Sequence, residues 1–381
     1  MNGTKNTSIS ARAIVAHEPI NGQPNWKLEN VTLRDLKPTE LVVRMVSTGL
    51  CHTDIVFSTW PKEAIPYPKV LGHEGAGIVQ QIGSDVKNAK VGDSVLLSFQ
   101  SCADCKDCND GHPSYCQQFS PLNYGGEQEV FEITNGPKSA GTFFGQSSFA
   151  SHTIVKESSI TNVSSVAKDE KELKLFAPFG CGFQTGVGTV DKLTGAGKND
   201  SIVILGLGGV GLAAIMAAKL KGCKTIIGVD RSQERLDMAS NFGATHIINT
   251  TNPALSLVDE VKSRTGGNGS SITIDTTGNM GVIGNGMDFT ANRGQMIILG
   301  VPPVEASLGV HLISFMQTGK SLRGSIEGDV TPSEYIPKMI QWYRDDKLPI
   351  DKLVKFYPVE EFESALADMK SAATVKPVLV W

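Results

Sequence analysis

The chain lacks any run of about eighteen apolar residues, so no segment of it is expected to span a membrane. It also lacks a strong excess of one charge, since 35 Lys and Arg stand against 39 Asp and Glu and the net charge is −4. Binding to nucleic acid or to an anionic membrane surface is therefore not expected. The first residues, MNGTKNTSIS, lack the apolar stretch of a secretion signal, which favours a cytoplasmic location.

The chain has only seven cysteines, an odd number in 381 residues, which argues against the disulfide framework of a small secreted domain. Clustered cysteines in a large cytoplasmic protein more often bind metal. Four of them fall within residues 102–116, namely Cys102, Cys105, Cys108 and Cys116. Four thiolates at this spacing suit a tetrahedral zinc ion whose closed ligand shell leaves no room for a substrate. We therefore predict a structural zinc site here.

The length predicts two or more domains of different character. Residues 1–150 are rich in Gly and Pro and contain short β-branched runs such as LVVRMVS and SVLLS, a pattern typical of a β domain. Residues 201–320 alternate short apolar runs with helical stretches, which predicts a doubly wound parallel sheet. The C-terminal residues contain amphipathic helical segments such as VEEFESALADMKS.

A glycine-rich turn opens the second of these regions. The stretch ILGLGGVG contains Gly206, Gly208 and Gly211, follows an apolar run and precedes a helical pattern. Such glycines let the backbone approach a pyrophosphate at a helix N-terminus. Asp230 ends the next apolar run, where a carboxylate can bind ribose hydroxyls and repel a 2′-phosphate, so NAD is favoured. Arg231 beside it leaves NADP possible.

The remaining cysteines are scattered. Cys51 and Cys181 lie in glycine-flanked turns, and His73 lies between them in the frame GHEGAGIVQQIG. Two thiolates and one imidazole with an open fourth position are a ligand set of catalytic zinc. Cys223 is most simply a small residue at a helix end.

On these motifs the chain resembles the zinc-dependent medium-chain alcohol dehydrogenases, from about residue 11 to residue 381. The resemblance depends on GHEGAGIVQQIG, the four-cysteine segment, GCGFQTGVG, GLGGVG with Asp230, and LGVPP. It implies an α/β protein with a GroES-like β-rich catalytic domain over residues 1–184, an NAD-binding Rossmann domain over 185–324 and a return to the catalytic domain over 325–381. It further implies an active site in the cleft between the domains, two zinc ions per chain, and a homodimer or homotetramer assembled through the edge of the Rossmann sheet.

The resemblance also implies roles around the catalytic zinc. The metal would be held by Cys51, His73 and Cys181. Glu74 matches an acid that approaches the metal when a ligand leaves, and Asp54 matches the carboxylate that orients the zinc-bound histidine. Thr53 matches the hydroxyl that takes the proton of the alcohol.

Further residues would contact the cofactor. Thr185, Val210 and Val301 would border the nicotinamide, and Arg235 would lie over the adenosine. The whole implied set is His52, Thr185, Gly206, Gly208, Gly209, Val210, Gly211, Asp230, Arg235, Val301 and Lys376, in which His52 and Lys376 would lie near the pyrophosphate.

Four residues fall where the family builds its substrate pocket, namely Trp60, Ser98, Phe143 and Phe144. Three aromatic rings suit a flat apolar substrate, and the pattern resembles aryl- and allylic-alcohol dehydrogenases. Val56 stands where many members carry a histidine that ends a proton relay. The expected reaction is hydride transfer between a primary aromatic or allylic alcohol and NAD, with aldehyde reduction as its reverse. The alternative is a biosynthetic reductase of the same fold that acts on an aldehyde, imine or activated alkene. A zinc-free quinone or enoyl reductase and a non-catalytic crystallin-like protein fit the ligand residues less well.

Overall fold

The computed structural model describes residues 9–381, which form two compact units. Unit 1 comprises the residues up to Gly182 together with Thr331–Gln341 and Asp351–Trp381. Unit 2 comprises Phe183–Val330 and Trp342–Ile350. The chain returns to unit 1 after residue 330 and passes once more through unit 2 at residues 342–350, within the segment assigned above to the catalytic domain.

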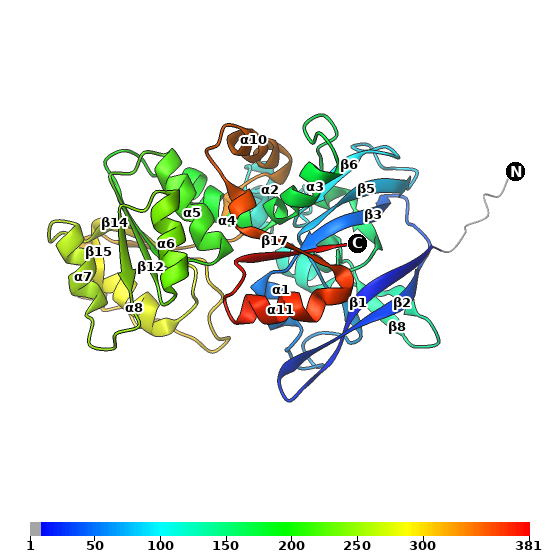
Figure 1. Ribbon diagram of the computed structural model, residues 1–381, viewed down its shortest axis with the longest axis horizontal. Coiled ribbons are helices and arrows are strands. Elements are labelled where there is room, and N and C mark those ends of the chain that lie inside the picture. Colours follow the sequence, from blue (N-terminus) through cyan, green and yellow to red (C-terminus); the bar gives the residue numbers. More distant parts are fainter. Residues whose placement is uncertain (1–8) are drawn as a thin grey trace, which may run out of the picture. The chain divides into compact units, whose positions relative to one another are not determined.

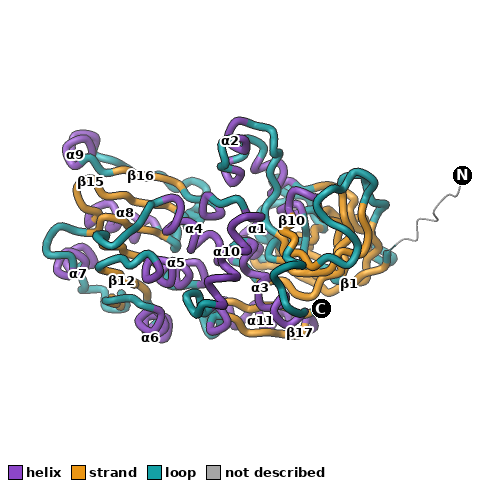
Figure 2. The backbone as a smooth tube through the Cα atoms, turned by 90° about the horizontal axis from the view of Figure 1, so that it is seen from above, coloured by secondary structure: helices purple, strands orange, loops and turns teal. Residues whose placement is uncertain are grey.

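Unit 1 is built from strands, as the β-branched runs predict (Figure 2). A closed barrel has the order β1-β2-β7-β8-β4 and a seven-stranded sheet has the order β10-β6-β5-β3-β18-β17, with β9 paired to β3. The barrel strands are β1 (Ser10–Ile20), β2 (Gln23–Leu33), β4 (Lys69–Val70), β7 (Glu127–Ile133) and β8 (Lys138–Gly141). The sheet strands are β3 (Glu40–Gly49), β5 (Gly75–Ile82), β6 (Ser94–Leu97), β9 (His152–Lys156), β10 (Ile160–Asn162), β17 (Val354–Pro358) and β18 (Lys376–Val380). Its short helices are α1 (His52–Phe57), α2 (Lys106–Asn109) and α3 (Glu170–Phe176).

Strand β3 is the central element of this unit. Nine of its ten residues are buried and only Arg44 is half-buried, which explains a sequence that is apolar on both faces. Its first residue, Glu40, is fully buried and accepts hydrogen bonds from both Nη atoms of Arg34 at 2.8 Å and from Lys156 Nζ at 2.6 Å. These charge-assisted bonds anchor the start of the strand. The strand ends at Gly49, just before Cys51.

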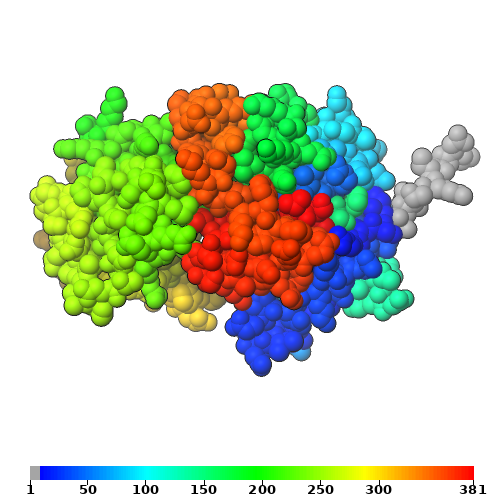
Figure 3. Space-filling view, in the orientation of Figure 1, coloured from blue at the N-terminus to red at the C-terminus, as the bar shows by residue number. Residues whose placement is uncertain are grey.

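The C-terminal segment completes unit 1. Strand β18 pairs antiparallel with β3 and parallel with β17. The predicted amphipathic helix is confirmed as α11 (Phe362–Lys370). Arg12 and Glu360 form an ion pair at 2.8 Å, and Figure 3 shows the red C-terminal residues beside the dark blue N-terminal ones. The pairing of β18 with β3 brings Lys376, which is distant in the sequence, next to the end of β3.

Unit 2 contains the predicted parallel sheet, with the order β13-β12-β11-β14-β15-β16 and helices along it (Figure 1). The doubly wound fold is thereby confirmed. The strands are β11 (Ser201–Leu205), β12 (Thr225–Asp230), β13 (His246–Asn249), β14 (Ser270–Asp275), β15 (Thr290–Ile298) and β16 (Ser321–Gly324). The helices are α5 (Gly209–Leu220), α6 (Gln233–Phe242), α7 (Leu257–Arg264), α8 (Met280–Phe289) and α9 (Leu312–Thr318). Two further helices, α4 (Gly182–Gly188) and α10 (Pro332–Arg344), each include residues of both units.

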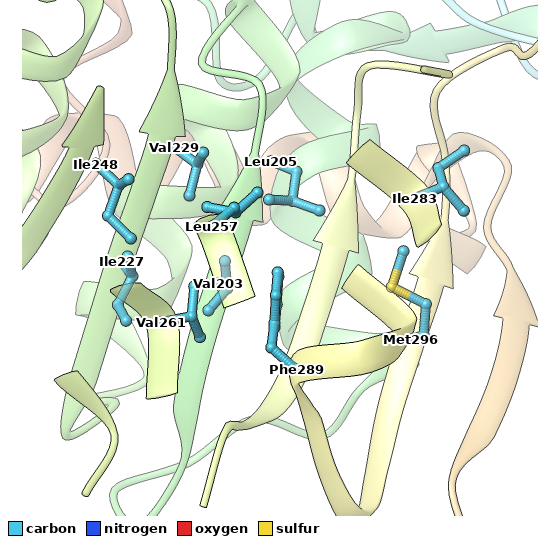
Figure 4. Close-up of a cluster of buried hydrophobic side chains, with 10 residues drawn as sticks. All are labelled: Val203, Leu205, Ile227, Val229, Ile248, Leu257, Val261, Ile283, Phe289 and Met296. Carbon is cyan, nitrogen blue, oxygen red and sulfur yellow. The ribbon is translucent and has the colours of Figure 1, made fainter. Parts of the chain in front are cut away.

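The core of unit 2 explains the apolar runs that predicted its strands. Val203, Leu205, Ile227 and Val229 point from β11 and β12 toward Phe289 and other buried side chains from the helices and neighbouring strands (Figure 4). Strands buried on both faces become continuous β-branched runs in the sequence. Among residues 9–381, no helix is long and apolar enough to cross a membrane.

Candidate catalytic and metal centres

The first centre begins where β3 ends. Cys51 is the N-cap of α1, and Asp54 in the first turn of that helix is fully buried. Asp54 Oδ2 accepts a hydrogen bond from Cys51 N at 3.1 Å, while Oδ1 accepts one from Gly72 N at 3.1 Å and contacts His73 Nδ1 at 2.9 Å. One carboxylate therefore orients two of the predicted zinc ligands, as the resemblance implies for Asp54.

His73 presents its second ring nitrogen to the other ligands. A carboxylate only accepts hydrogen bonds, so Nδ1 donates to Asp54, and in the neutral imidazole that binds a metal Nε2 then carries the lone pair. Nε2 is buried and has no hydrogen-bond partner. Four possible ligand atoms lie within 4.8 Å of one another, one each from Cys51, His73, Glu74 and Cys181. A buried acceptor without a partner, facing thiols, is the arrangement that a zinc ion satisfies, so these residues fit the metal.

A hydrogen bond and nearby charges favour the thiolate form of Cys51. The pKa of Cys51 is lowered well below its ordinary value by a hydrogen bond from Cys181 and by the charges of His73 and Lys376, although burial opposes the shift. The thiolate is the form that binds metals. Cys181 is positioned by a close approach of two backbones, since a Cβ at the preceding Gly180 would lie 1.8 Å from Leu97 O.

Glu74 is held by Lys376. Glu74 is fully buried; its Oε1 accepts hydrogen bonds from Lys376 Nζ at 2.8 Å and Gly182 N at 3.1 Å, and its Oε2 contacts the same Nζ at 3.0 Å. Burial raises the pKa of Glu74 to about 7, against the opposing charge of Lys376. Burial would lower the pKa of Lys376, but the charges of Glu74 and Cys51 outweigh it and raise that pKa. The ammonium expected near a pyrophosphate thus pairs with Glu74 and also donates to Leu50 O at 3.1 Å.

The second centre is the four-cysteine lobe around α2 (Figure 2). Its sulfur atoms lie 3.5 Å apart between Cys105 and Cys108 and 3.9 Å apart between Cys102 and Cys108. Four ligands at a Zn–S distance of about 2.3 Å in a tetrahedron require about 3.8 Å between sulfurs. Backbone N–H groups of Cys105 and Cys102 donate to Cys102 Sγ and Cys116 Sγ, each at 3.3 Å. None of the seven cysteines, all within residues 9–381, forms a disulfide. The lobe therefore fits a structural zinc.

Aromatic rings pack against the imidazole of His73. The ring of Phe144 stacks on the imidazole with centroids 4.6 Å apart, and Phe143 meets it edge-on at 5.6 Å. Trp60 packs on Phe57 at 4.4 Å. Ser98, also predicted for the pocket, is buried and its hydroxyl donates to Gly180 O at 2.6 Å, so it helps to place Cys181.

Gln146 is a residue of this centre that the sequence did not reveal. It is fully buried, and its Nε2 donates to His73 O and Ser98 O, each at 3.0 Å, while its Oε1 accepts from Gly75 N at 3.1 Å. It therefore holds the backbone on both sides of Glu74. Its neighbours Thr142, Phe144 and Ser147 have φ of 54°, 52° and 53°, a conformation that costs free energy and is retained where geometry must be fixed. No pattern in the sequence signals such a segment.

In unit 2 the glycine-rich turn joins β11 to α5. Gly206 has φ of +89°, and a Cβ at Gly211 would lie 1.9 Å from Gly206 O, so both positions need glycine. Nothing lies within 4 Å of a Cβ at Gly208, where a ligand can approach. Gly209 and Val210 are the first, half-buried residues of α5, whose N–H groups face no earlier turn of helix.

Asp230 lies at the end of β12 beside this turn. Its Oδ2 accepts a hydrogen bond from Leu207 N at 2.7 Å, and its Oδ1 accepts from Arg231 N at 2.7 Å and Ser232 N at 2.9 Å. Because each carboxylate oxygen accepts two hydrogen bonds, Oδ2 retains one lone pair for a ligand.

The other predicted cofactor residues occupy varied environments. His52 is exposed, Val301 is 60% exposed, and Arg235 on α6 is half-buried with its Nε lacking a hydrogen-bond partner. Thr185 is buried, and its hydroxyl lies 3.4 Å from Glu327 Oε2. Their contacts with a cofactor remain predictions.

Comparison with known proteins shows the family of the chain. Residues 37–165 match the family described as alcohol dehydrogenase GroES-like domain, and residues 209–345 match zinc-binding dehydrogenase. A geraniol dehydrogenase of Castellaniella defragrans is 36% identical over the full length of both chains. The chain belongs to the zinc-dependent medium-chain alcohol dehydrogenases. It is therefore an oxidoreductase, as the resemblance in its motifs predicts.

Two solved structures of this family are similar throughout. An alcohol dehydrogenase zinc-binding domain protein from Burkholderia ambifaria is 37% identical with a TM-score of 0.91, covering 98% of this chain and 99% of the other. Benzyl alcohol dehydrogenase from Acinetobacter calcoaceticus is 33% identical with a TM-score of 0.88, at the same coverage. The GroES-like and Rossmann-type architecture inferred from the motifs is thereby confirmed.

Proposed function

We propose that this dehydrogenase oxidises primary aromatic or allylic alcohols with NAD, reducing the corresponding aldehydes in reverse. The observation that carries the proposal is the group of half-buried Cys51 and buried His73 and Cys181, in which His73 Nε2 has no partner and aromatic rings cover the imidazole. The names of two relatives, a geraniol dehydrogenase and a benzyl alcohol dehydrogenase, support this substrate class.

The residues of the first centre divide the work. Zinc bound to Cys51, His73 and Cys181 would supply a Lewis acid for the substrate oxygen, and bound NAD would accept the hydride. Asp54 keeps His73 in the tautomer that presents Nε2. Thr53 is half-buried and, within residues 9–381, its hydroxyl makes no hydrogen bond to another residue, so it is available to take the alcohol proton. Lys376 holds the carboxyl of Glu74 in place through an ion pair, and the aromatic rings exclude water from the imidazole.

We infer NAD rather than NADP as the cofactor because Asp230 offers a lone pair at the end of β12, where a 2′-phosphate would meet its charge. Two zinc ions per chain follow from the two ligand sets. A cytoplasmic location remains a prediction, which the many reduced thiols favour.

The first test measures NADH formation from NAD with benzyl alcohol and ethanol side by side. We expect kcat/KM for benzyl alcohol to exceed that for ethanol by at least about tenfold, because a ring buries more apolar surface than a methyl group. The same assay with NADP checks the cofactor. If protein that holds two zinc ions oxidises neither alcohol, the proposal is contradicted and the alternative reductase is favoured. Val56 at the position of the relay histidine is compatible with that alternative.

We also propose that the chain forms a dimer through the free edge of β16. This strand ends the sheet of unit 2, and the neighbouring residues Val304, Leu312, Ile313 and Met316 are 60–82% exposed. An apolar sheet edge favours association with a second copy.

Light scattering should give twice the chain mass, or four times if dimers pair. Met316→Lys should give monomers, whereas Val91→Lys, a change at a 60% exposed residue of unit 1, should not. A monomeric wild-type protein would refute the dimer.

A further inference from the structure

Unit 1 contains a buried lysine that the proposed chemistry does not use. Lys69 on β4 is fully buried, and no carboxylate of the described residues lies within ion-pair distance of it. Its Nζ donates a hydrogen bond to Tyr124 O at 2.7 Å and lies 3.4 Å from Gly125 O. The same Nζ lies 5.2 Å from the centroid of the Phe143 ring. The ammonium is therefore compensated only by carbonyl dipoles and a ring face.

This arrangement is costly for the fold. A buried cation without a counter-ion costs several kcal/mol even when hydrogen-bonded, and an apolar side chain of similar length would fill the same space without that cost. Consistent with this, burial lowers the pKa of Lys69 to about 8. Buried ionisable groups with perturbed pKa values cluster at functional sites, so a role for Lys69 near the first centre is expected.

Lys69 contacts a continuous group of aromatic side chains. We call Phe57, Trp60, Tyr124, Phe143 and Phe144 the aromatic wall; the ring of Phe57 contacts those of Trp60, Tyr124 and Phe143 at centroid distances of 4.4, 4.7 and 5.3 Å. Tyr124 meets Phe144 at 5.7 Å. The wall reaches the predicted zinc ligand directly, since both Phe143 and Phe144 contact His73.

The wall is assembled from separate segments, two of which contact Lys69. Tyr124 belongs to the short helical turn Pro121–Gly125, whereas Phe143 belongs to the strained turn that follows β8. The Lys69 ammonium donates to the carbonyl of Tyr124 and lies over the ring of Phe143. It thereby adds a polar link between the two segments to the ring contact of Tyr124 with Phe144.

We propose that Lys69 is a positioning residue that fixes the aromatic wall and so determines preference for flat unsaturated alcohols over small saturated ones. The inference deepens the proposed function and rests on it. It assigns no proton transfer to Lys69, which acts only through the rings that it holds.

The test compares Lys69→Met, Lys69→Gln and the control Lys138→Met with wild type. Methionine keeps the length and loses the donor, whereas glutamine keeps a donor for Tyr124 O. Lys138 lies on the surface of β8, where its side chain is 57% exposed. We expect Lys69→Met to lower the ratio of kcat/KM for benzyl alcohol to that for ethanol at least about tenfold, with glutamine partly restoring it and the control unchanged. The thermal midpoint of Lys69→Met should be equal to or above that of wild type, and its zinc content unchanged, since a buried unpaired charge is removed.

A second readout separates this inference from the proposed function. Benzamide, an unreactive aromatic amide, is titrated into each variant with NADH present. If wild type fails to oxidise benzyl alcohol, the proposed function fails, and the benzamide affinity alone tests Lys69: weaker binding by Lys69→Met and not by Lys138→Met supports positioning. An unchanged substrate ratio and unchanged benzamide affinity in folded Lys69→Met would overturn the inference. Failure of Lys69→Gln to fold would also overturn it, because Lys69 would then serve the fold.

Discussion

Replacement of Cys181 by serine is expected to lower kcat/KM for alcohol oxidation by about a thousandfold or more. The hydroxyl of serine does not ionise as a thiol does, so the site loses one of its anionic ligands and the affinity for zinc falls. A metal that polarises the substrate oxygen contributes several kcal/mol, and about 4 kcal/mol corresponds to this factor. The zinc content should decrease from two ions per chain to one, because the four-cysteine lobe keeps its ligands.

Cys223→Ser is the matched control. Cys223 is also buried, burial raises the pKa of its thiol to about 11, and it belongs to neither ligand set. Metal analysis and steady-state kinetics on both variants, with circular dichroism to check the fold, complete the measurement. A Cys181→Ser enzyme that keeps two zinc ions and wild-type turnover would show that Cys181 is not a ligand.

Replacement of Asp230 by glycine is expected to lower the ratio of kcat/KM for NAD to kcat/KM for NADP by about a hundredfold. A hydrogen bond between the carboxylate and a ribose hydroxyl contributes about 1.5–3 kcal/mol, so its loss should lower kcat/KM for NAD about ten- to a hundredfold. Removing the negative charge also removes the repulsion of a 2′-phosphate, so kcat/KM for NADP should rise. The neighbouring Arg231 can then pair with that phosphate.

The control for this change must preserve the turn, because Asp230 also accepts backbone hydrogen bonds from Leu207, Arg231 and Ser232. Asp230→Asn keeps one acceptor oxygen and loses the charge, so its preference should lie between those of wild type and the glycine variant. Initial rates with both cofactors at one fixed alcohol concentration provide the ratio. An identical ratio in all three proteins would show that Asp230 does not select the cofactor.

Much of this protein was determined by local sequence. The parallel sheet was predictable because strands buried on both faces must be apolar throughout, as Val203, Leu205 and Ile227 are. The glycine-rich turn was predictable because only glycine tolerates the backbone of Gly206 and the approach at Gly211. The four-cysteine lobe was predictable because all its ligands lie within one short segment, so their spacing alone brings the sulfurs together.

The first centre was partly predictable. The types of its ligands, two cysteines and a histidine, suggested catalytic zinc. Because these residues are far apart in the chain, only the family resemblance indicated that they lie close together. The fold brings Cys51, His73 and Cys181 together because β3, β5 and the turn at Gly180 meet in unit 1. The start of β18 adds Lys376, whose ammonium pairs with Glu74, a contact that the sequence did not reveal.

Only the tertiary structure decided which side chains hold this centre in place. The contacts of Gln146 with the backbone around Glu74 and of Lys69 with the aromatic wall join residues 55 to 74 positions apart in the chain. Hydrogen bonds and ring contacts depend on distances of a few ångströms in space, and no periodicity or motif records them when their partners lie on different strands. The chemistry of the protein is therefore readable in its sequence as ligand types, whereas the arrangement that supports this chemistry is a property of the packed fold.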